Sequence, residues 1–269
     1  MNDAVQSAQP FTMAGLAGFY PSGVRSLPSR HMGQPIGNVL MSADADAPLT
    51  ELLKAARRAK RLEKERIVRD SEKAEWFHLA YGIGAVKGGP QPEANNGWMD
   101  VTYDVSNWCR ACNGGVIQKA PYRFKSELKL GRMGVFTAYW GFYGLFAEMK
   151  VWETLLVPFG VRSIPILHAK TGLPLKTAVQ LDLDSLVWNS PFDESGHAKW
   201  TCDQCHRSVF VYPDISMPRF DRYPDAPVFV TSQRFGDHIY SRPLIFVRRE
   251  VAAKIASAKL KYVFLLPVV

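Results

Sequence analysis

All four cysteines of the chain lie in two short stretches, Trp108-Cys109-Arg110-Ala111-Cys112 and Trp200-Thr201-Cys202-Asp203-Gln204-Cys205. Each stretch contains a C-x-x-C pair, and a tight turn of this kind places two sulfur atoms on one side of a loop, as two corners of a tetrahedron require. Gly114 and Gly115 follow the first pair, where they allow the backbone to turn back and aim N–H groups at sulfur. Two pairs with no cysteine left over predict one metal site with four ligands, Cys109, Cys112, Cys202 and Cys205.

The ligand set favours zinc in a structural role. Four thiolates complete the tetrahedron and leave no open position for a substrate or a water molecule. Because 89 residues separate Cys112 from Cys202, the metal closes a large loop and removes conformational entropy from the unfolded chain. Three alternatives use the same cysteines: rubredoxin-like iron, a redox dithiol, and a local Cys₂His₂ site in which His197 and His206 join the second pair.

The composition is that of a globular protein. The 269 residues are 47% apolar and 22% charged, which is enough to bury a core and excludes disorder of the whole chain. The first residues lack the pattern of a secretory signal, and the most apolar stretch, from Gly134 to Ala147, is too short to span a bilayer. We therefore expect a cytoplasmic protein without a membrane partner.

The charge of the chain narrows the chemistry of its partner. Lys and Arg number 33 against 25 for Asp and Glu, which gives a net charge of +8. A basic chain suits a neutral or acidic protein partner, and it is also compatible with nucleic acid.

The first 78 residues divide into two segments. Prolines and glycines interrupt residues 1–47 and predict a flexible leader. Residues 48–78 predict a charged helix, because apolar residues such as Leu49, Leu52 and Leu53 recur at helical spacing. Its bases could contact phosphates, but the acids between them favour a solvated helix with i,i+4 ion pairs.

Residues 79–269 predict an α+β domain that holds the metal. Alternation from Trp98 to Val105 predicts a strand that leads into the first pair. The C-terminal part predicts strands at 226–231, 244–247 and 262–269, with a helix at 249–260. The expected fold class is α+β, with a mixed sheet around a split, zinc-ribbon-like Cys₄ site, an N-terminal helix and a flexible leader.

Between the two cysteine pairs lies a segment that we call the aromatic insertion. Its aromatic residues are Phe136, Tyr139, Trp140, Phe142, Tyr143, Phe146, Trp152 and Phe159. Several of its aromatic residues fall three or four apart, which predicts a short amphipathic helix. Such a stripe more often packs into a core than binds a partner. If it is exposed, the partner-binding anchors are Tyr139, Trp140, Phe142, Tyr143 and Trp152.

Motifs of common enzyme classes are absent from the sequence. There is no G-x-S-x-G elbow, no G-x-x-x-x-G-K-[ST] phosphate loop and no H-E-x-x-H zinc motif. The best group of carboxylates comprises Asp182, Asp184, Asp193 and Glu194, and a loop with solvated acids accounts for it more simply than a catalytic pair. We therefore expect a protein that is not an enzyme.

Several features of residues 98–269 occur together: the two distant C-x-x-C pairs, the stretch Leu181-Asp182-Leu183-Asp184-Ser185-Leu186, and the closing Leu266-Pro267-Val268. In this layout the chain resembles the double-CxxCG proteins, known mainly from myxobacteria, which include immunity proteins of polymorphic toxin systems. The family pattern has glycine directly after each second cysteine, where this chain has Asn113 and His206.

The resemblance implies that the four cysteines are metal ligands in a non-enzymatic protein that binds and neutralises a cognate toxin. The toxin-like partner should be neutral or acidic, because the chain is basic. The alternative is a zinc-ribbon protein that binds nucleic acid through residues 54–73, Arg248 and Arg249.

Overall fold

The computed structural model describes residues 65–67, 69–81, 97–131, 133–137, 144–192, 194, 197–211, 217–236 and 241–269. The leader 1–47 and the predicted helix up to residue 64 lie outside the described residues. All described residues belong to one compact unit, Ile36–Val269. This unit is α+β, with many strands and few helices in its described part, which confirms the predicted class.

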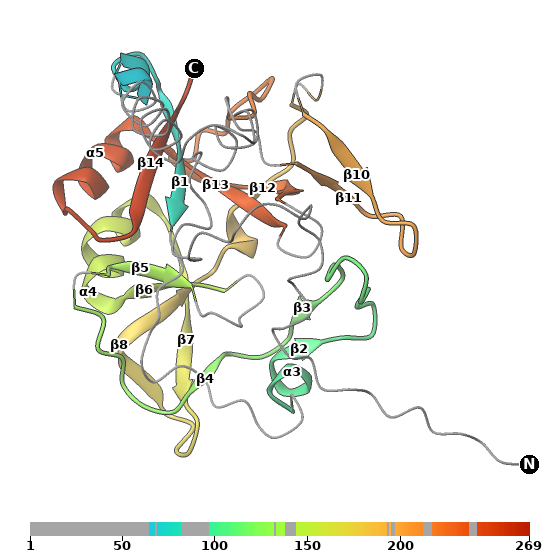
Figure 1. Ribbon diagram of the computed structural model, residues 1–269. Coiled ribbons are helices and arrows are strands. Elements are labelled where there is room, and N and C mark those ends of the chain that lie inside the picture. The colour runs from blue at the N-terminus through green and yellow to red at the C-terminus, as the bar shows by residue number, and fades with distance from the viewer. Residues whose placement is uncertain are drawn as a thin grey trace, which may run out of the picture. The chain divides into compact units, whose positions relative to one another are not determined.

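A seven-stranded mixed sheet forms one layer (Figure 1). Its strands pair in the order β10–β11–β12–β13–β1–β14, and β9 pairs with β12. The β11–β12 and β9–β12 pairs are parallel and the others antiparallel. The bounds are β1 Trp76–Tyr81, β9 Val187–Trp188, β10 Lys199–Thr201, β11 Ser208–Phe210, β12 Val228–Phe235, β13 Arg242–Arg248 and β14 Val263–Val268.

A five-stranded sheet forms a second layer, in the order β4–β7–β8–β6–β5. The bounds are β4 Arg123–Phe124, β5 Val135–Thr137, β6 Leu145–Glu148, β7 Ser163–His168 and β8 Pro174–Leu181. Helical turns follow β6 as α4 Met149–Val151, a π-helical turn Trp152–Leu156 and a 3-10 turn Val157–Phe159, and a further 3-10 turn, Asp184–Leu186, follows β8. The segment between the cysteine pairs therefore builds a sheet, and the short helical run is only its connection.

The main hydrophobic core lies between the two sheets. It joins Val179 of β8 and Leu145 of β6 to Val230 of β12 and Val247 of β13. The helix α5, Arg249–Ser257, contributes Val251, Ala252 and Ile255, the apolar side expected from the sequence. The predicted C-terminal order of strand, strand, helix and strand is confirmed by β12, β13, α5 and β14.

Two further cores pack on the outer faces of the sheets. Phe136 of β5 and Phe146 of β6 are fully buried in a cluster that also contains Phe124 of β4 and Ile166 of β7, across one face of the five-stranded sheet. On the outer face of the seven-stranded sheet, Phe229 stacks on Phe246 and contacts Trp76 edge-on. The described aromatic residues at positions 136 and 146 are therefore core residues, as is usual for such a stripe.

The predicted helix 48–78 is wrong at its C-terminal end. Residues 65–67 and 69–71 are helical, but Trp76 begins β1, which lies between β13 and β14. Trp76 to Leu79 are all buried, because a central strand is covered on both faces. His78 is part of this burial: loss of hydration lowers its pKa to about 4, although its Nδ1 lies 3.0 Å from the Ile245 carbonyl oxygen.

The predicted strand 98–105 is also wrong over most of its length. Residues Gly97–Thr102 form the short helix α3, and only Tyr103–Asp104 are extended, as β2. Met99 and Thr102 are buried and Asp100 is exposed in the first turn, where its charge favours the helix N-terminus. The three-residue spacing of the buried Met99 and Thr102 therefore decides the conformation, and the alternation of apolar and polar residues does not. β2 pairs with β3, Ile117–Gln118, as a separate two-stranded sheet.

Candidate metal centre

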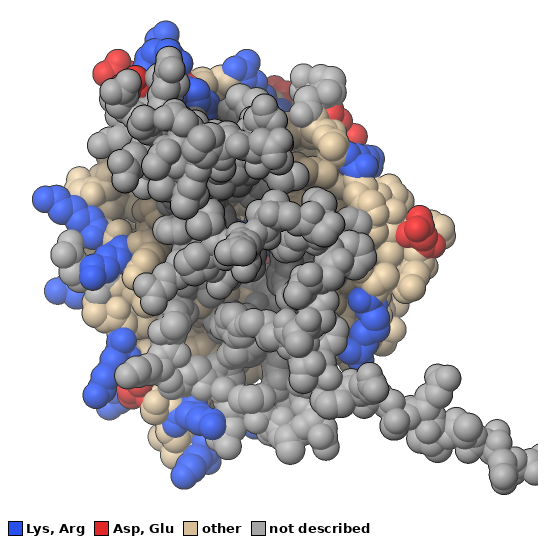
Figure 2. Space-filling model, viewed as in Figure 1, with Lys and Arg blue, Asp and Glu red and all other residues tan. Residues whose placement is uncertain are grey.

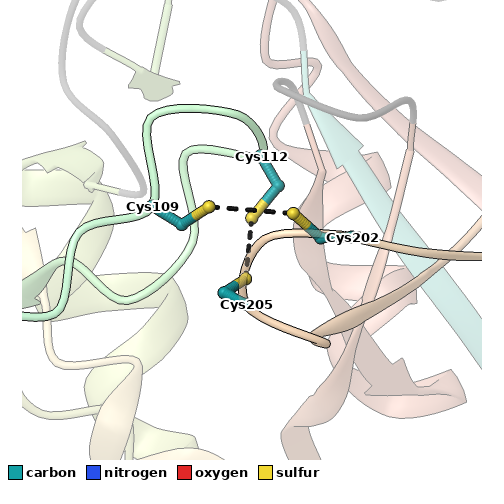
Figure 3. A group of neighbouring side chains, drawn as sticks. All are labelled: Cys109, Cys112, Cys202 and Cys205. Atoms are coloured by element: carbon teal, nitrogen blue, oxygen red, sulfur yellow. Dashed lines mark hydrogen bonds between the residues drawn. The ribbon is translucent and has the colours of Figure 1, made fainter.

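The structure brings the four cysteines together, as the two C-x-x-C pairs predict (Figure 3). Their sulfur atoms all lie within 4.8 Å of one another. The Sγ atoms of Cys109 and Cys202 are 3.7 Å apart, and those of Cys112 and Cys205 are 3.5 Å apart. Tetrahedral bonds of about 2.3 Å to zinc place two sulfur ligands about 3.8 Å apart. The spacing and the donor type therefore fit a zinc ion or a similar metal ion.

Each pair sits in a loop that we call a knuckle. The first knuckle, residues 108–115, lies between β2 and β3, and the second, residues 200–207, contains the turn that joins β10 to β11 (Figure 1). The thiol contacts join residues 93 positions apart in the sequence. A metal held by all four sulfur atoms therefore ties the edge of the seven-stranded sheet to the β2–β3 ribbon.

The two knuckles repeat the same backbone hydrogen bonds. The N–H of Cys109 donates to the Gly114 carbonyl oxygen, and the N–H of Cys202 donates to that of Arg207, both over 2.9 Å. In each knuckle the second cysteine's sulfur accepts a backbone N–H from two residues further on: Gly114 N–H donates to Cys112 Sγ over 3.4 Å, and Arg207 N–H donates to Cys205. The same hydrogen-bonded turn thus occurs twice around the four cysteines.

The residue after each second cysteine adopts a left-handed conformation. Asn113 has φ 52° and His206 has φ 58°. Glycine is the residue best suited to this region, and asparagine and histidine enter it more readily than most others. The absence of glycine in the two C-x-x-C motifs therefore does not change the turn that they form. The C-x-x-C spacing predicts the turn, but it does not reveal that Asn113 and His206 take a positive φ.

Side chains lock each knuckle and join one to the other. The Arg207 guanidinium donates to the Asn107 carbonyl oxygen over 3.3 Å, across the site. Gly115, at φ +88°, lies beneath this link, and a Cβ there would collide with the same carbonyl and lie 2.7 Å from the guanidinium. Trp108 Nε1 donates to Asn113 Oδ1 over 3.2 Å, which ties the left-handed residue to the start of its loop.

Most of the cluster is closed to solvent. Cys109, Cys112 and Cys202 are buried, Cys205 is half-buried, and Trp200 packs against the group. Burial raises the pKa of the Cys112 thiol to about 12, although the Gly114 N–H opposes this effect. Burial also raises the pKa of the Cys205 thiol. The hydrogen bonds from the Arg207 N–H and the three other thiols outweigh this effect and lower the pKa of Cys205 to about 6. A bound cation would favour the thiolate at all four positions.

The described metal-ligand group consists of the four cysteines, so the local Cys₂His₂ alternative finds no support. His197 instead packs edge-on to Phe192, with 5.4 Å between the ring centres. Among the acids of the second candidate group, Asp182 pairs with Arg162 at 3.1 Å and Glu194 with Lys199 at 3.5 Å. Two of these acids therefore form surface ion pairs, and Asp193 lies outside the described residues.

The predicted partner-binding aromatics fall largely outside the described residues, at Tyr139, Trp140, Phe142 and Tyr143. Trp152 is described: it is half-buried, packs against the main core, and donates from Nε1 to the Val161 carbonyl oxygen over 2.9 Å. Its role as an anchor stays a prediction.

The two arginines proposed for nucleic acid are engaged within the protein. Arg248 donates to the Pro224 and Asp225 carbonyl oxygens at 3.2 and 3.1 Å, and lies over the Trp76 ring. Arg249 donates to the Glu72 and Ala74 carbonyl oxygens. Both guanidinium groups therefore connect β13 and α5 to neighbouring segments, which leaves fewer donors for phosphate.

In comparisons with known proteins, no family model and no curated protein matches this chain. Among the described residues, no helix is both long enough and apolar enough to cross a membrane.

Proposed function

We propose that the chain is a non-enzymatic binding protein whose fold is held by a structural zinc ion, and that it neutralises an acidic toxin-like protein. The observation that carries the proposal is the group of four cysteine sulfur atoms within 4.8 Å of one another. Cys109, Cys112, Cys202 and Cys205 would hold the metal and complete its coordination, so the site supplies rigidity and no open position for chemistry.

Zinc supplies a cross-link here, and the chain's own residues prepare it. The knuckle turns aim backbone N–H groups at Cys112 and Cys205, and these donors stabilise negative charge on sulfur. Trp200 and the surrounding loops keep three of the four sulfur atoms away from water. A buried, hydrogen-bonded group of thiolates is the arrangement expected of a structural metal site.

The positive charge supports an acidic partner. Residues 117–181, which include the five-stranded sheet, contain nine Lys and Arg and three Glu, a net charge of +6 out of the chain's +8. Figure 2 shows Lys and Arg side chains gathered at the lower left of the molecule, where Figure 1 places β4, β7 and β8. The exposed bases there are Arg123, Lys125, Lys170 and Lys176.

Strand register puts part of this charge on one face. Arg123 is paired with Leu167, and Leu167 with Pro174, so that Arg123 and Lys176 share the face turned away from the buried Phe124. None of the four bases forms an ion pair with an acid within the described part of the chain. The Glu127 carboxylate accepts the Lys176 backbone N–H over 2.9 Å, so one acid borders the face. The face suits an acidic protein surface.

The resemblance to double-CxxCG proteins supports the immunity role. The positions where that pattern has glycine are the two left-handed residues, Asn113 and His206. The backbone conformation that favours glycine is therefore present at both places, although the side chains differ.

The test is purification of the native protein from its host, followed by mass spectrometry of what accompanies it. We expect one acidic protein partner, encoded beside this chain, in a salt-sensitive complex. The variant Arg123→Glu/Lys125→Glu should lose the partner, whereas Arg222→Glu/Lys261→Glu, with the same change in charge at other exposed positions, should keep it. Recovery of nucleic acid without a protein partner would overturn the proposal in favour of the nucleic-acid alternative.

A further inference from the structure

The four thiols are paired across the two knuckles. Two thiol–thiol hydrogen bonds of the cluster, from Cys109 to Cys202 and from Cys112 to Cys205, join one knuckle to the other (Figure 3). Each sulfur atom is thus directed at a partner 93 residues away, although a neighbour lies three residues away in the same loop. The fold therefore gives each cysteine a partner for a bond across the knuckles, besides the cysteine within its own C-x-x-C pair.

We propose that, in the absence of metal, a peroxide converts this site into two disulfides that cross between the knuckles, Cys112–Cys205 and Cys109–Cys202. The inference deepens the proposed function, because it rests on the same four cysteines and assigns them a second, covalent state. In that state the two disulfides connect the knuckles, so the cross-link between them persists after the metal is lost.

Exposure sets the order of the two steps. Cys205 is half-buried and the other three cysteines are buried, so a small oxidant reaches the Cys205 sulfur first. The Cys205 thiol and hydrogen peroxide give a sulfenic acid and one water molecule. Cys112, whose sulfur is 3.5 Å away, then loses its proton and attacks that sulfur as the thiolate. The S–S bond forms as the S–O bond of the sulfenic acid breaks, and the departing hydroxide takes up the proton as a second water molecule.

The second disulfide consumes a second molecule of peroxide by the same reactions at Cys109 and Cys202, whose sulfur atoms are 3.7 Å apart. Disulfide bonds are about 2.05 Å long, so the two sulfur atoms of each pair approach by about 1.5 Å when the bond forms. Metal protects the site, because a thiolate that donates its electron pair to zinc is a poorer nucleophile toward peroxide.

The sequence makes the connectivity readable. Trypsin cleaves after Arg110, which separates Cys109 from Cys112, and an endoproteinase specific for Asp cleaves before Asp203, which separates Cys202 from Cys205. The full chain is stripped of metal by a chelator under reducing conditions, freed of reductant and treated with hydrogen peroxide. Remaining thiols are then alkylated, and linked peptides are identified by mass spectrometry.

We expect the Cys112–Cys205 link to appear first and the Cys109–Cys202 link to follow, with both cross-knuckle links dominating the linked fraction. The same reaction in denaturant is the control, where short loops close more readily and within-pair links should dominate. Cys205→Ser should abolish the first link and leave Cys109–Cys202, which shows that the two bonds form independently. Links within the pairs in the native protein, or sulfinic and sulfonic acids without disulfides, would overturn the proposal.

The outcome is separable from that of the proposed function. A chain that is purified without metal but gives cross-knuckle links would contradict the structural zinc and support the disulfide pairing. A chain that purifies with zinc but gives within-pair links once the metal is removed would support the structural zinc and contradict the disulfide pairing.

Discussion

The two knuckles share one backbone conformation but differ in what holds them. Paired strands flank the second knuckle, with Lys199 opposite Phe210, and β11 continues into the seven-stranded sheet through β12. The strands that flank the first knuckle, β2 and β3, have two residues each and pair only with each other among the described strands. The same turn is therefore supported by a sheet in one case and chiefly by its own contacts in the other. We infer that the metal contributes more to the order of the first knuckle.

Removal of the metal should have the largest effect and should fall unequally on the two knuckles. Loss of a structural metal is among the changes that cost about 4 kcal/mol or more in the free energy of unfolding. Hydrogen exchange with and without a chelator should show that amides of residues 108–115 lose more protection than those of residues 200–207, while both knuckles stay better protected than the unfolded chain. Equal loss in both would contradict the comparison.

Gly115→Ala should be the most damaging substitution that leaves all ligands in place. Its φ of +88° disfavours a side chain, and the new Cβ would collide with Asn107 and Arg207. We expect a loss of about 3 kcal/mol in the free energy of unfolding, measured by denaturant titration. Gly160→Ala is the matched control, because Gly160 has φ +79° with open space around it, and it should lose only about 1 kcal/mol.

Arg207→Ala should weaken the connection between the knuckles without removing a ligand. The guanidinium bond to the Asn107 carbonyl oxygen is lost, while the backbone N–H that faces Cys205 remains. We expect a loss of about 1 kcal/mol in stability, with zinc still bound in a ratio of one per chain. The amides of Trp108 and Cys109, which donate to the Val105 and Gly114 carbonyl oxygens, should lose protection. Unchanged protection there would show that the link does not order the first knuckle.

The smallest effects should have opposite signs in the two knuckles. His206→Gly relieves a left-handed side chain at φ 58° and should stabilise the chain by about 0.5 kcal/mol, after the greater unfolded-state entropy of glycine is subtracted. Asn113→Gly also removes the bond from Trp108 and should destabilise the chain by about 0.5 kcal/mol. Thermal unfolding of the two variants measures both. Stabilisation by Asn113→Gly would mean that the Trp108 bond contributes nothing.

The clustering of the four cysteines was predictable because its signal is local. The C-x-x-C spacing specifies a turn, and Cys109, Cys112, Cys202 and Cys205 offered one complete set of four donors. The strands and helix of residues 226–269 were predictable for a similar reason, since α5 has its apolar residues on one side and β12 and β13 contain short apolar runs, residues 228–230 and 244–247.

The misjudged segments are those whose conformation depends on distant neighbours. Trp76 to His78 extend a helical pattern in the sequence, but they become a strand because β13 and β14 lie on either side. Phe136 and Phe146 look like part of a helical stripe, yet they face each other across the β5–β6 pair. In both segments the neighbouring strands determine the extended conformation, and the spacing of residues within one segment does not show which strands will pair with it.

The central claim is that four sulfur ligands hold one zinc ion between the two knuckles. X-ray absorption at the zinc edge of the purified full chain tests it most directly. We predict one zinc per chain with four sulfur neighbours at about 2.3 Å, and a loss of the bound metal in Cys202→Ser. A first shell that contains nitrogen or oxygen ligands, or a fully stable chain that purifies without metal, would contradict the account.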